Sequence, residues 1–410
     1  MEVDHELVDT RLMCSADVLP ESGQPRLGRS ARFGNWFDEN KWPITVYTST
    51  RVALFAFAVI LDAVFGIFIH RESLSREFGN WDGWWYIRIA TIGYHHSIGH
   101  VQTSLGFFPL YSMAIWLVAH ALFCSYVIAG FIISTIGGLV ATIQVQRLAR
   151  DWWGPAVARK SVLLFCLFPG SIIFSMVYSE GILIPLVLGC LLALSHKKWV
   201  LAGVLAGVAT AVGPDALTVI PMCLAASFVQ LRKYGWHDTD ARRSLIAPAL
   251  SPFGAIAFAS FLWAWTGTPF ASFIAQSKGW HERTTPLAMP NQLLMLIHEI
   301  GFRLRWSRIN LNIPIGLLGL VFLIVGLRWL WRDRRTVPLE ATVFTIFMSF
   351  LMVTSLHVPP TPRLLITAFP VVLIFAKRLQ GRAWTRMIWI TGALFFLLSA
   401  FTYVGSFIRP

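Results

Sequence analysis

Long runs of apolar residues, separated by short polar connections, dominate the chain from residue 45 to its end. A run of about 20 apolar residues crosses a bilayer as one helix, so each run is a candidate transmembrane helix. The runs lie at 45–69, 126–147, 160–177, 180–195, 199–212, 214–231, 245–265, 311–330, 338–356, 363–376 and 386–405. They predict an all-α polytopic membrane protein, a bundle of about 11 transmembrane helices.

One further apolar segment, 105-LGFFPLYSMAIWLVAHALF-123, determines the predicted topology. If it crosses the bilayer, the basic residues at 147–160 lie outside; if it lies at the interface or re-enters, they face the cytoplasm. We adopt the second arrangement because it places basic residues in every inner connection, as the positive-inside rule expects. It predicts two large outer loops, about 70–125 and 266–310, with short interfacial helices in the first.

The composition fits this class, since 56% of the 410 residues are hydrophobic and only 13% are charged. Soluble domains carry about 25% charged residues. Lys and Arg number 34 against 21 Asp and Glu, a formal charge of +13 that would suggest nucleic-acid binding in a soluble protein. In a polytopic protein the same excess indicates basic cytoplasmic loops. The five cysteines are scattered, so we expect neither a disulfide framework nor a structural zinc site.

The N-terminal region differs from the rest of the chain. Residues 1–43 are mostly polar, include Pro20 and Pro25, and lack the apolar core of a signal peptide. We therefore predict a flexible cytoplasmic tail over 1–43 and a transmembrane domain over 44–410.

Acidic residues are rare outside the polar connections, and three of them stand out. Asp82 lies among rings in 79-GNWDGWWYIRIATIGYHHS-97, either as a helix cap within an aromatic belt or as a reactive group. Glu180 lies in a short predicted outer turn, 177–181, between two apolar runs, where an acid is costly and tends to be functional. Asp215 follows Pro214, and an acid at a helix N-terminus is also a common structural device.

Other polar residues suggest less. His95, His96 and His100 have spacing that could bind a metal, but no strong helical pattern fixes that spacing, so we expect no metal. Arg51 and Asp62 both lie in the first predicted span, about 16 Å apart along a helix. That distance is too long for pairing within the helix, so we expect these residues to make helix-packing or partner contacts.

Several motifs occur in a fixed order along the chain. They are 81-WDGWWYIRIATIGY-94, FFPLY at 107–111, 177-VYSEG-181, 202-AGVLAGVATAVGPDAL-217, 275-AQSKGW-280 and 362-PRLLITAFP-370. In this order the chain resembles the GPI mannosyltransferase II (PIG-V-like) family of GT-C membrane glycosyltransferases, including its bacterial members. Two positions depart from the family pattern: Gly213 stands where the family usually has a basic residue, and Leu364 replaces the tyrosine of a PRY tripeptide.

The resemblance implies a GT-C-like bundle in a bacterial plasma membrane, with a cytoplasmic N-terminus and an extracytoplasmic active site. It implies a polyprenyl- or dolichyl-phosphate sugar donor, usually of mannose, and a hydroxyl acceptor that is itself lipid-linked or a glycan. No nucleic acid and no cofactor are expected. A sugar on a lipid phosphate has a good leaving group already, so the reaction requires one base rather than the two carboxylates of a glycosidase.

The resemblance also assigns candidate roles. Asp82 is the candidate catalytic base, and Arg363 is placed to bind the departing phosphate, with Lys278 and Arg283 as alternatives. An interfacial snorkelling arginine is the other interpretation of Arg363. The candidate substrate-binding residues are Trp81, Tyr86, Tyr94, Tyr178, Glu180, Asp215, Gln276, Trp280 and Arg363.

Two other functions stay open at this point. A transporter or lipid flippase would use the acidic residues as coupling or substrate sites, although transporters tend to place such groups at the bilayer midplane. In the predicted topology Asp82, Glu180, Asp215 and Arg363 map to one outer surface, which favours an enzyme. A catalytically inactive relative is the third possibility, suggested by Gly213.

Overall fold

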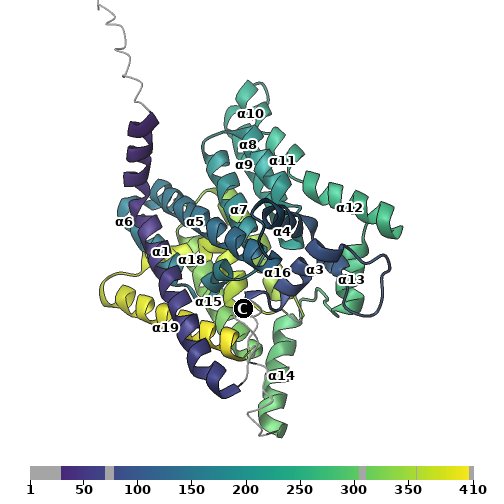
Figure 1. The fold of residues 1–410 in the computed structure, drawn as a ribbon. Helices are drawn as coiled ribbons and strands as arrows, with labels where there is room; N and C mark the ends of the chain where they lie inside the picture. Colours follow the sequence, from purple (N-terminus) through teal and green to yellow (C-terminus); the bar gives the residue numbers. More distant parts are fainter. Residues whose placement is uncertain (1–28, 70–77, 304–310, 357, 406–410) are drawn as a thin grey trace, which may run out of the picture. The chain divides into compact units, whose positions relative to one another are not determined.

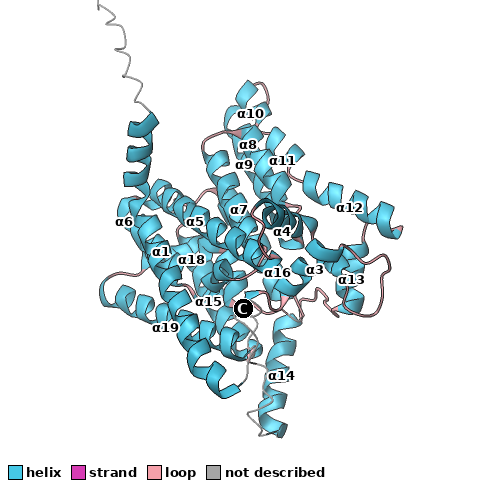
Figure 2. Ribbon diagram, in the orientation of Figure 1, coloured by secondary structure: helices cyan, strands magenta, loops and turns pink. Residues whose placement is uncertain are grey.

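The computed structural model describes residues 29–69, 78–303, 311–356 and 358–405. Within these ranges every regular element is a helix (Figure 2). A single antiparallel bridge between Thr284 and Ser355 joins the second predicted outer loop to the end of a later helix.

The α-helices and 3-10 helices (η) follow one another along the chain, and Figure 1 labels most of the α-helices. They are α1 (Arg29–Ile69), α3 (Asp82–Ile92), η1 (Ser104–Gly106), α4 (Pro109–Ala121), α5 (Tyr126–Trp153), α6 (Pro155–Leu167), η2 (Pro169–Ser175), α7 (Glu180–Ser195), α8 (Trp199–Ala209), η3 (Pro214–Thr218), α9 (Val219–Tyr234), α10 (Thr239–Arg243), α11 (Ile246–Leu250), α12 (Phe253–Thr266), α13 (Ala271–Gly279), α14 (Ala288–Arg303), α15 (Asn312–Arg332), α16 (Leu339–Thr354), α17 (Pro362–Thr367), α18 (Phe369–Arg378) and α19 (Gly381–Gly405).

Apolar helices of membrane-spanning length confirm the predicted all-α membrane class. Among the described residues, six helical stretches are long and apolar enough to cross a bilayer, and α6 with η2 forms a further pair bent by 71°. Four shorter apolar helices, α4, α7, α8 and α16, complete the apolar set. The predicted number of about 11 spans stays a prediction.

The chain divides into two units between Lys41 and Trp42, within α1, and the second unit contains the rest of α1 and all the later helices. Residues 1–28 of the predicted tail lie outside the described residues. Helix α1 begins at Arg29, before the first apolar run. The apolar pattern did not predict this start because the opening turns of the helix are mostly polar. The predicted boundary at residue 43 therefore stays untested.

The first predicted outer loop contains short helices in its described part. Helices α3 and α4 have 11 and 13 residues, so each is shorter than about 20 Å and cannot cross a hydrocarbon core of about 30 Å. The segment 105–123 therefore forms no simple span, while its side of the membrane stays a prediction.

The main core surrounds α18, in which every residue from Phe369 to Ala376 is buried. A helix that is apolar on all sides must be enclosed by other helices, and α6, α15 and α16 pack against it. The preceding helix, α17, is thereby held at one end of the core. A second, smaller core of aromatic and aliphatic residues joins α3, α4 and α5.

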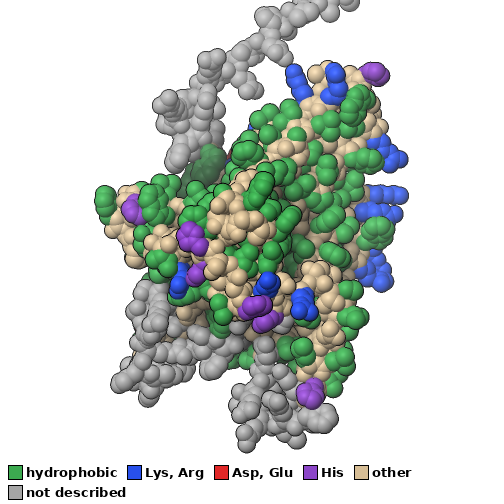
Figure 3. All heavy atoms as spheres, turned by 90° about the vertical axis from the view of Figure 1, so that its right-hand side faces the viewer, with side chains coloured by type: hydrophobic (Ala, Val, Ile, Leu, Met, Phe, Trp, Pro, Cys, Tyr) green, Lys and Arg blue, Asp and Glu red, His purple; other side chains and the backbone are tan. Residues whose placement is uncertain are grey.

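One face of the molecule shows how the remaining apolar residues are distributed. Hydrophobic side chains cover much of it, and Lys and Arg gather at its upper end and right-hand edge (Figure 3). Large apolar side chains such as Trp263, Phe253 and Leu318 are 65%, 69% and 73% exposed. So much exposed apolar surface is typical of a protein that faces lipid.

Candidate active site

One guanidinium group joins two carboxylates from distant parts of the chain. Arg363 Nη1 donates to Asp82 Oδ2 at 2.5 Å, and Arg363 Nε donates to Glu180 Oε1, also at 2.5 Å. The Glu180 side chain is 3% exposed, whereas those of Asp82 and Arg363 are 28% and 21% exposed. Glu180 therefore holds Arg363 from the buried side, and Asp82 lies on the accessible side.

Helix ends position all three charged groups. Asp82 is the first residue of α3 and Glu180 the first of α7, so each carboxylate lies at a helix N-terminus, where the helix dipole favours negative charge. Arg363 is the second residue of α17, after Pro362. Trp81, just before Asp82, has φ of 59°, which is uncommon for a bulky residue and is a form of strain that clusters at functional sites.

The turn before α7 forms the floor beneath Arg363. The Tyr178 ring lies under the guanidinium, with Arg363 Cζ 4.5 Å from the ring centroid, a distance typical of a cation–π contact. Tyr86 Oη donates to Ser179 Oγ at 2.9 Å, which fixes the residue adjacent to Glu180. Burial raises the pKa of the Tyr86 hydroxyl well above its ordinary value, and the charges of Asp82 and Glu180 add to this, so Tyr86 remains a donor.

The glycine after Asp82 is required by the packing of this turn. A Cβ atom on Gly83 would lie 2.9 Å from the Val177 carbonyl oxygen, closer than real Cβ contacts. On the other side, the Val177 backbone N–H donates to the Phe78 carbonyl at 2.9 Å. The Asp-Gly pair of the first motif thus allows α3 to approach the turn that carries Glu180.

An aromatic cluster extends from this site to the second predicted outer loop. Trp85 stacks with Phe107 at 5.7 Å between centroids and meets Trp280 edge-on at 5.4 Å, while Phe107 also contacts Tyr86 at 5.1 Å. Gln276 Nε2 donates to the Gly106 carbonyl at 3.0 Å. Gln276 and Trp280 therefore connect the two predicted outer loops, while their role as substrate contacts stays a prediction.

Tyr94 lies further from the charged groups. Its hydroxyl donates to the Phe107 carbonyl at 2.9 Å, and its ring packs against Phe258 and Phe261 of α12. The structure therefore places this candidate in a helix-packing contact and in the wall of an apolar groove rather than beside Arg363. Trp85 and Phe107 were not among the candidates, although both lie in the matched motifs.

Asp215 lies close enough to Glu180 and Arg363 for electrostatic interaction, in the 3-10 turn η3. A Cβ atom on Gly213 would lie 2.6 Å from Asp215 Oδ1. Any side chain at residue 213 would therefore displace this carboxylate. Gly213, the first departure from the family pattern, thus leaves room for the Asp215 carboxylate. Leu364, the second departure, packs against the main core.

The histidines of the first loop point to different partners. His95 Nδ1 lies 2.8 Å from Ser104 Oγ, and the His96 ring stacks on Trp265 at 3.9 Å between centroids. Each ring thus makes a structural contact of its own.

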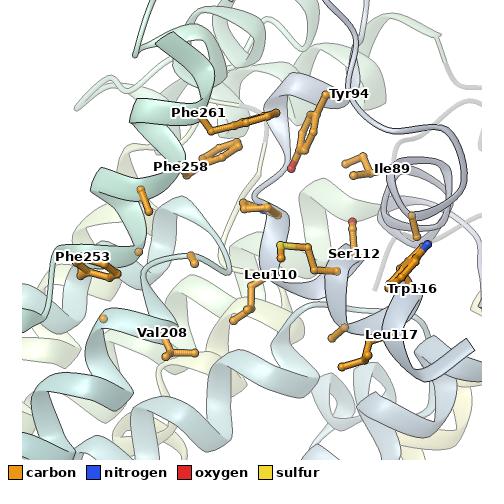
Figure 4. Close-up of a pocket in the computed structure, with 18 of the residues that line it drawn as sticks. Ile89, Tyr94, Leu110, Ser112, Trp116, Leu117, Val208, Phe253, Phe258 and Phe261 are labelled. Atoms are coloured by element: carbon orange, nitrogen blue, oxygen red, sulfur yellow. The ribbon is translucent and has the colours of Figure 1, made fainter. Parts of the chain in front are cut away.

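A large apolar groove lies beside the aromatic cluster (Figure 4). Its volume is about 1210 Å³, and α3, α4, α8, α11 and α12 line it. Figure 4 shows Leu110, Trp116 and Leu117 on one side and Val208, Phe253 and Phe258 on the other. Helix α3 borders the groove with Ile89, about 10 Å along the helix axis from Asp82.

A solved structure shares this fold, and a second is reported beside it. The apo oligosaccharyltransferase of Archaeoglobus fulgidus superposes with a TM-score of 0.50 at 13% identity, covering 86% of this chain and 56% of that one. ArnT from Cupriavidus metallidurans, bound to undecaprenyl phosphate, gives a TM-score of 0.44 at 14% identity, over 83% of this chain and 62% of that chain. No described protein family and no curated protein matches the sequence.

The chain thus spans little more than half the length of the oligosaccharyltransferase that it resembles. That likeness confirms the predicted GT-C-like all-α fold and concerns the fold alone.

Proposed function

We propose that this protein is an inverting glycosyltransferase that moves a sugar from a polyprenyl-phosphate donor to a hydroxyl group. The sugar we propose is mannose, which the family resemblance implies. The observation that supports this most directly is the joining of Asp82, Glu180 and Arg363, which come from three of the matched motifs. The GT-C-like fold and the motif order of the PIG-V-like family support the same reaction class.

Asp82 is the proposed base because it is the more exposed carboxylate, 28% against 3% for Glu180. In the reaction Asp82 accepts the proton of the acceptor hydroxyl while that oxygen bonds to the anomeric carbon. The bond from that carbon to the phosphate oxygen breaks, and the polyprenyl phosphate leaves with the electron pair. Taking up the proton also removes one of the two negative charges that share a single guanidinium.

Arg363 is the proposed phosphate ligand. A guanidinium carries five N–H donors, and the carboxylates use its Nε and one Nη1 hydrogen. The remaining donors suit a phosphate oxygen, with charge-assisted hydrogen bonds that strengthen as the leaving group gains charge. Glu180 and the Tyr178 ring fix the orientation of the Arg363 guanidinium. The side chain is therefore already ordered before the phosphate binds.

Two buried polar atoms in the matched motifs suit sugar hydroxyls. Glu180 Oε2 and Trp280 Nε1 are buried, and neither makes a hydrogen bond to another described residue. Buried polar atoms normally make at least one hydrogen bond. The Glu180 Oε2 acceptor and the Trp280 Nε1 donor therefore favour a polar ligand. Gln276, Tyr86 and Asp215 are proposed as the polar surroundings of that sugar, and Trp81 as part of its aromatic border.

The apolar groove is the proposed seat of the isoprenoid chain. Its lining residues are almost all apolar, and several, including Met113 and Leu117, are 63% and 61% exposed, as expected of a groove open to lipid. A lipid chain entering sideways from the bilayer would reach the Asp82 end of α3 along its wall. We place this site on the extracytoplasmic face of a bacterial plasma membrane, with the N-terminus cytoplasmic.

The test is transfer by the purified full-length chain in lipid nanodiscs. Radiolabelled polyprenyl-phospho-mannose is added with extracted membrane lipids and glycans, and the product is characterised. Asp82→Asn is expected to fold and to lose activity by a factor of about 10² or more. The matched control is Asp62→Asn, the same chemical change at an exposed acid of α1, and it is expected to keep full activity.

Full transfer by Asp82→Asn would remove Asp82 from the base role. Movement of labelled lipid between leaflets without any glycosylated product would instead favour the flippase alternative.

A further inference from the structure

Among the described residues, a buried arginine outside the charged site has neutral groups as its hydrogen-bond and ring partners. Arg51, in α1, is 8% exposed, and its Nη1 donates to the Ser171 carbonyl at 2.7 Å while Nη2 donates to the Cys166 carbonyl at 3.0 Å. The Ser171 hydroxyl accepts from Nη2 at 3.1 Å and donates to the same Cys166 carbonyl at 2.8 Å. The rings of Tyr47 and Phe395 lie 5.3 and 5.0 Å from its Cζ.

No carboxylate pairs with Arg51 in the part of the chain that the structure describes. An unpaired cation within a membrane-spanning helix is expensive and marks a functional or structural requirement. The helix-packing contact expected from the sequence is therefore a set of hydrogen bonds to backbone carbonyls.

The carbonyls that Arg51 binds lie at a break in the chain. Helix α6 ends at Leu167, and the chain turns by 71° into η2, which starts with Pro169. The last carbonyls of a helix lack donors from their own helix, and proline contributes no N–H to replace them. Arg51 supplies two donors at this break, so it fixes the direction in which η2 leaves α6.

Helix η2 contacts the backbone of Arg363, and the chain that follows η2 contacts the Arg363 side chain. A Cβ atom on Gly170 would overlap the Pro362 carbonyl and lie 2.9 Å from the Arg363 backbone nitrogen, so the two backbones are in direct contact. Beyond Ser175 the chain runs into Tyr178 and Glu180, which hold the Arg363 side chain. The position of η2 therefore sets both the backbone and the side-chain partners of Arg363.

We infer that Arg51 is a positioning residue for the phosphate-binding Arg363, acting through η2. The inference rests on the proposed function only where it concerns catalysis. Its structural part, that Arg51 holds η2 and the turn 177–180 in place, stands independently of which reaction the site performs.

The experiment measures the opening of that turn directly. Val177 is fully buried, so Val177→Cys in a chain lacking the native cysteines reports exposure through its rate of labelling by a maleimide in nanodiscs. Arg51→Met is expected to speed labelling by about tenfold or more, because it removes the two guanidinium hydrogen bonds to the buried carbonyls of Cys166 and Ser171. Arg51→Lys, which keeps one charged donor group, is expected to restore most of the protection.

The matched control is Ser227→Ala, which removes a buried hydrogen bond of 2.8 Å to the Ser244 carbonyl at a different helix contact. It is expected to leave Val177→Cys labelling unchanged. Should Arg51→Met yield too little folded protein, Ser171→Ala removes one of the Arg51 contacts and is expected to give a smaller increase in the same direction.

Transfer kinetics then connect this opening to catalysis. Arg51→Met is expected to lower kcat/KM for the lipid-phosphate sugar by about tenfold or more per folded molecule, with partial recovery in Arg51→Lys. Labelling of Arg51→Met at the rate of the Ser227→Ala control would overturn the inference. A wild-type chain that transfers no sugar would refute the proposed function alone, since the labelling comparison still decides the role of Arg51.

Discussion

The shared guanidinium predicts that the two ion pairs of Arg363 differ in strength. Arg363→Met removes the cation from both carboxylates at once. Glu180 is 3% exposed, so it is left as a buried charge without a counter-charge, and breaking a buried pair in this way costs about 3–5 kcal/mol. Asp82 is 28% exposed and regains water, so its share is about 1 kcal/mol.

A pair of double-mutant cycles separates the two terms. In Arg363→Met/Glu180→Gln neither charge remains, so the double variant is expected to be more stable than Arg363→Met alone. The coupling energy between residues 180 and 363 is expected to be about 3 kcal/mol. The coupling between residues 82 and 363, from the Asp82→Asn cycle, is expected to be about 1 kcal/mol.

The assay is equilibrium unfolding in mixed micelles, followed by the loss of helical circular dichroism. The control cycle uses Lys197 and Asp240, an ion pair at 3.2 Å whose side chains are 45% and 44% exposed, and no measurable coupling is expected there. Equal couplings for the two Arg363 pairs would refute the reasoning from burial. So would a double variant no more stable than Arg363→Met.

Three further predictions follow from the same contacts. Tyr178→Phe keeps the ring 4.5 Å from the Arg363 guanidinium and should retain most activity, whereas Tyr178→Leu should lower kcat by about tenfold. Equal kcat values for the two variants would show that the ring does not hold the guanidinium in place. Ala257→Trp, in the groove wall, should raise KM for long-chain donors by about tenfold without affecting short-chain ones, and an equal effect on both would contradict the groove assignment. Gly83→Ala should destabilise by about 1–3 kcal/mol, while Gly392→Ala, whose added Cβ meets nothing within 4 Å, should be neutral or stabilising; similar unfolding curves would argue against the close approach.

The candidate site was predictable only in part. Asp82, Glu180 and Arg363 stand out in the sequence because acids and arginines are rare among apolar runs, and the motif order assigned Asp82 and Arg363 their roles. Their direct contact was not predictable from the sequence. Arg363 is 281 positions from Asp82 and 183 positions from Glu180, and the packing of α3, α7 and α17 brings the three residues together. Tyr94 shows the converse: a motif residue whose side chain the fold places in a helix contact.

The sequence by itself determined the class of the protein, since long apolar runs leave a helical membrane bundle as the main solution to burying backbone polar groups in lipid. It also determined which residue types were available for chemistry. Only the tertiary structure decided which carboxylate is buried against Arg363 and which remains accessible, and that Arg51 binds the carbonyls at the break between α6 and η2. The burial of a side chain and its hydrogen-bond partners depend on which segments pack together in the folded chain. Helix periodicity predicts which face of a helix is apolar, but it does not predict which other helix packs against that face.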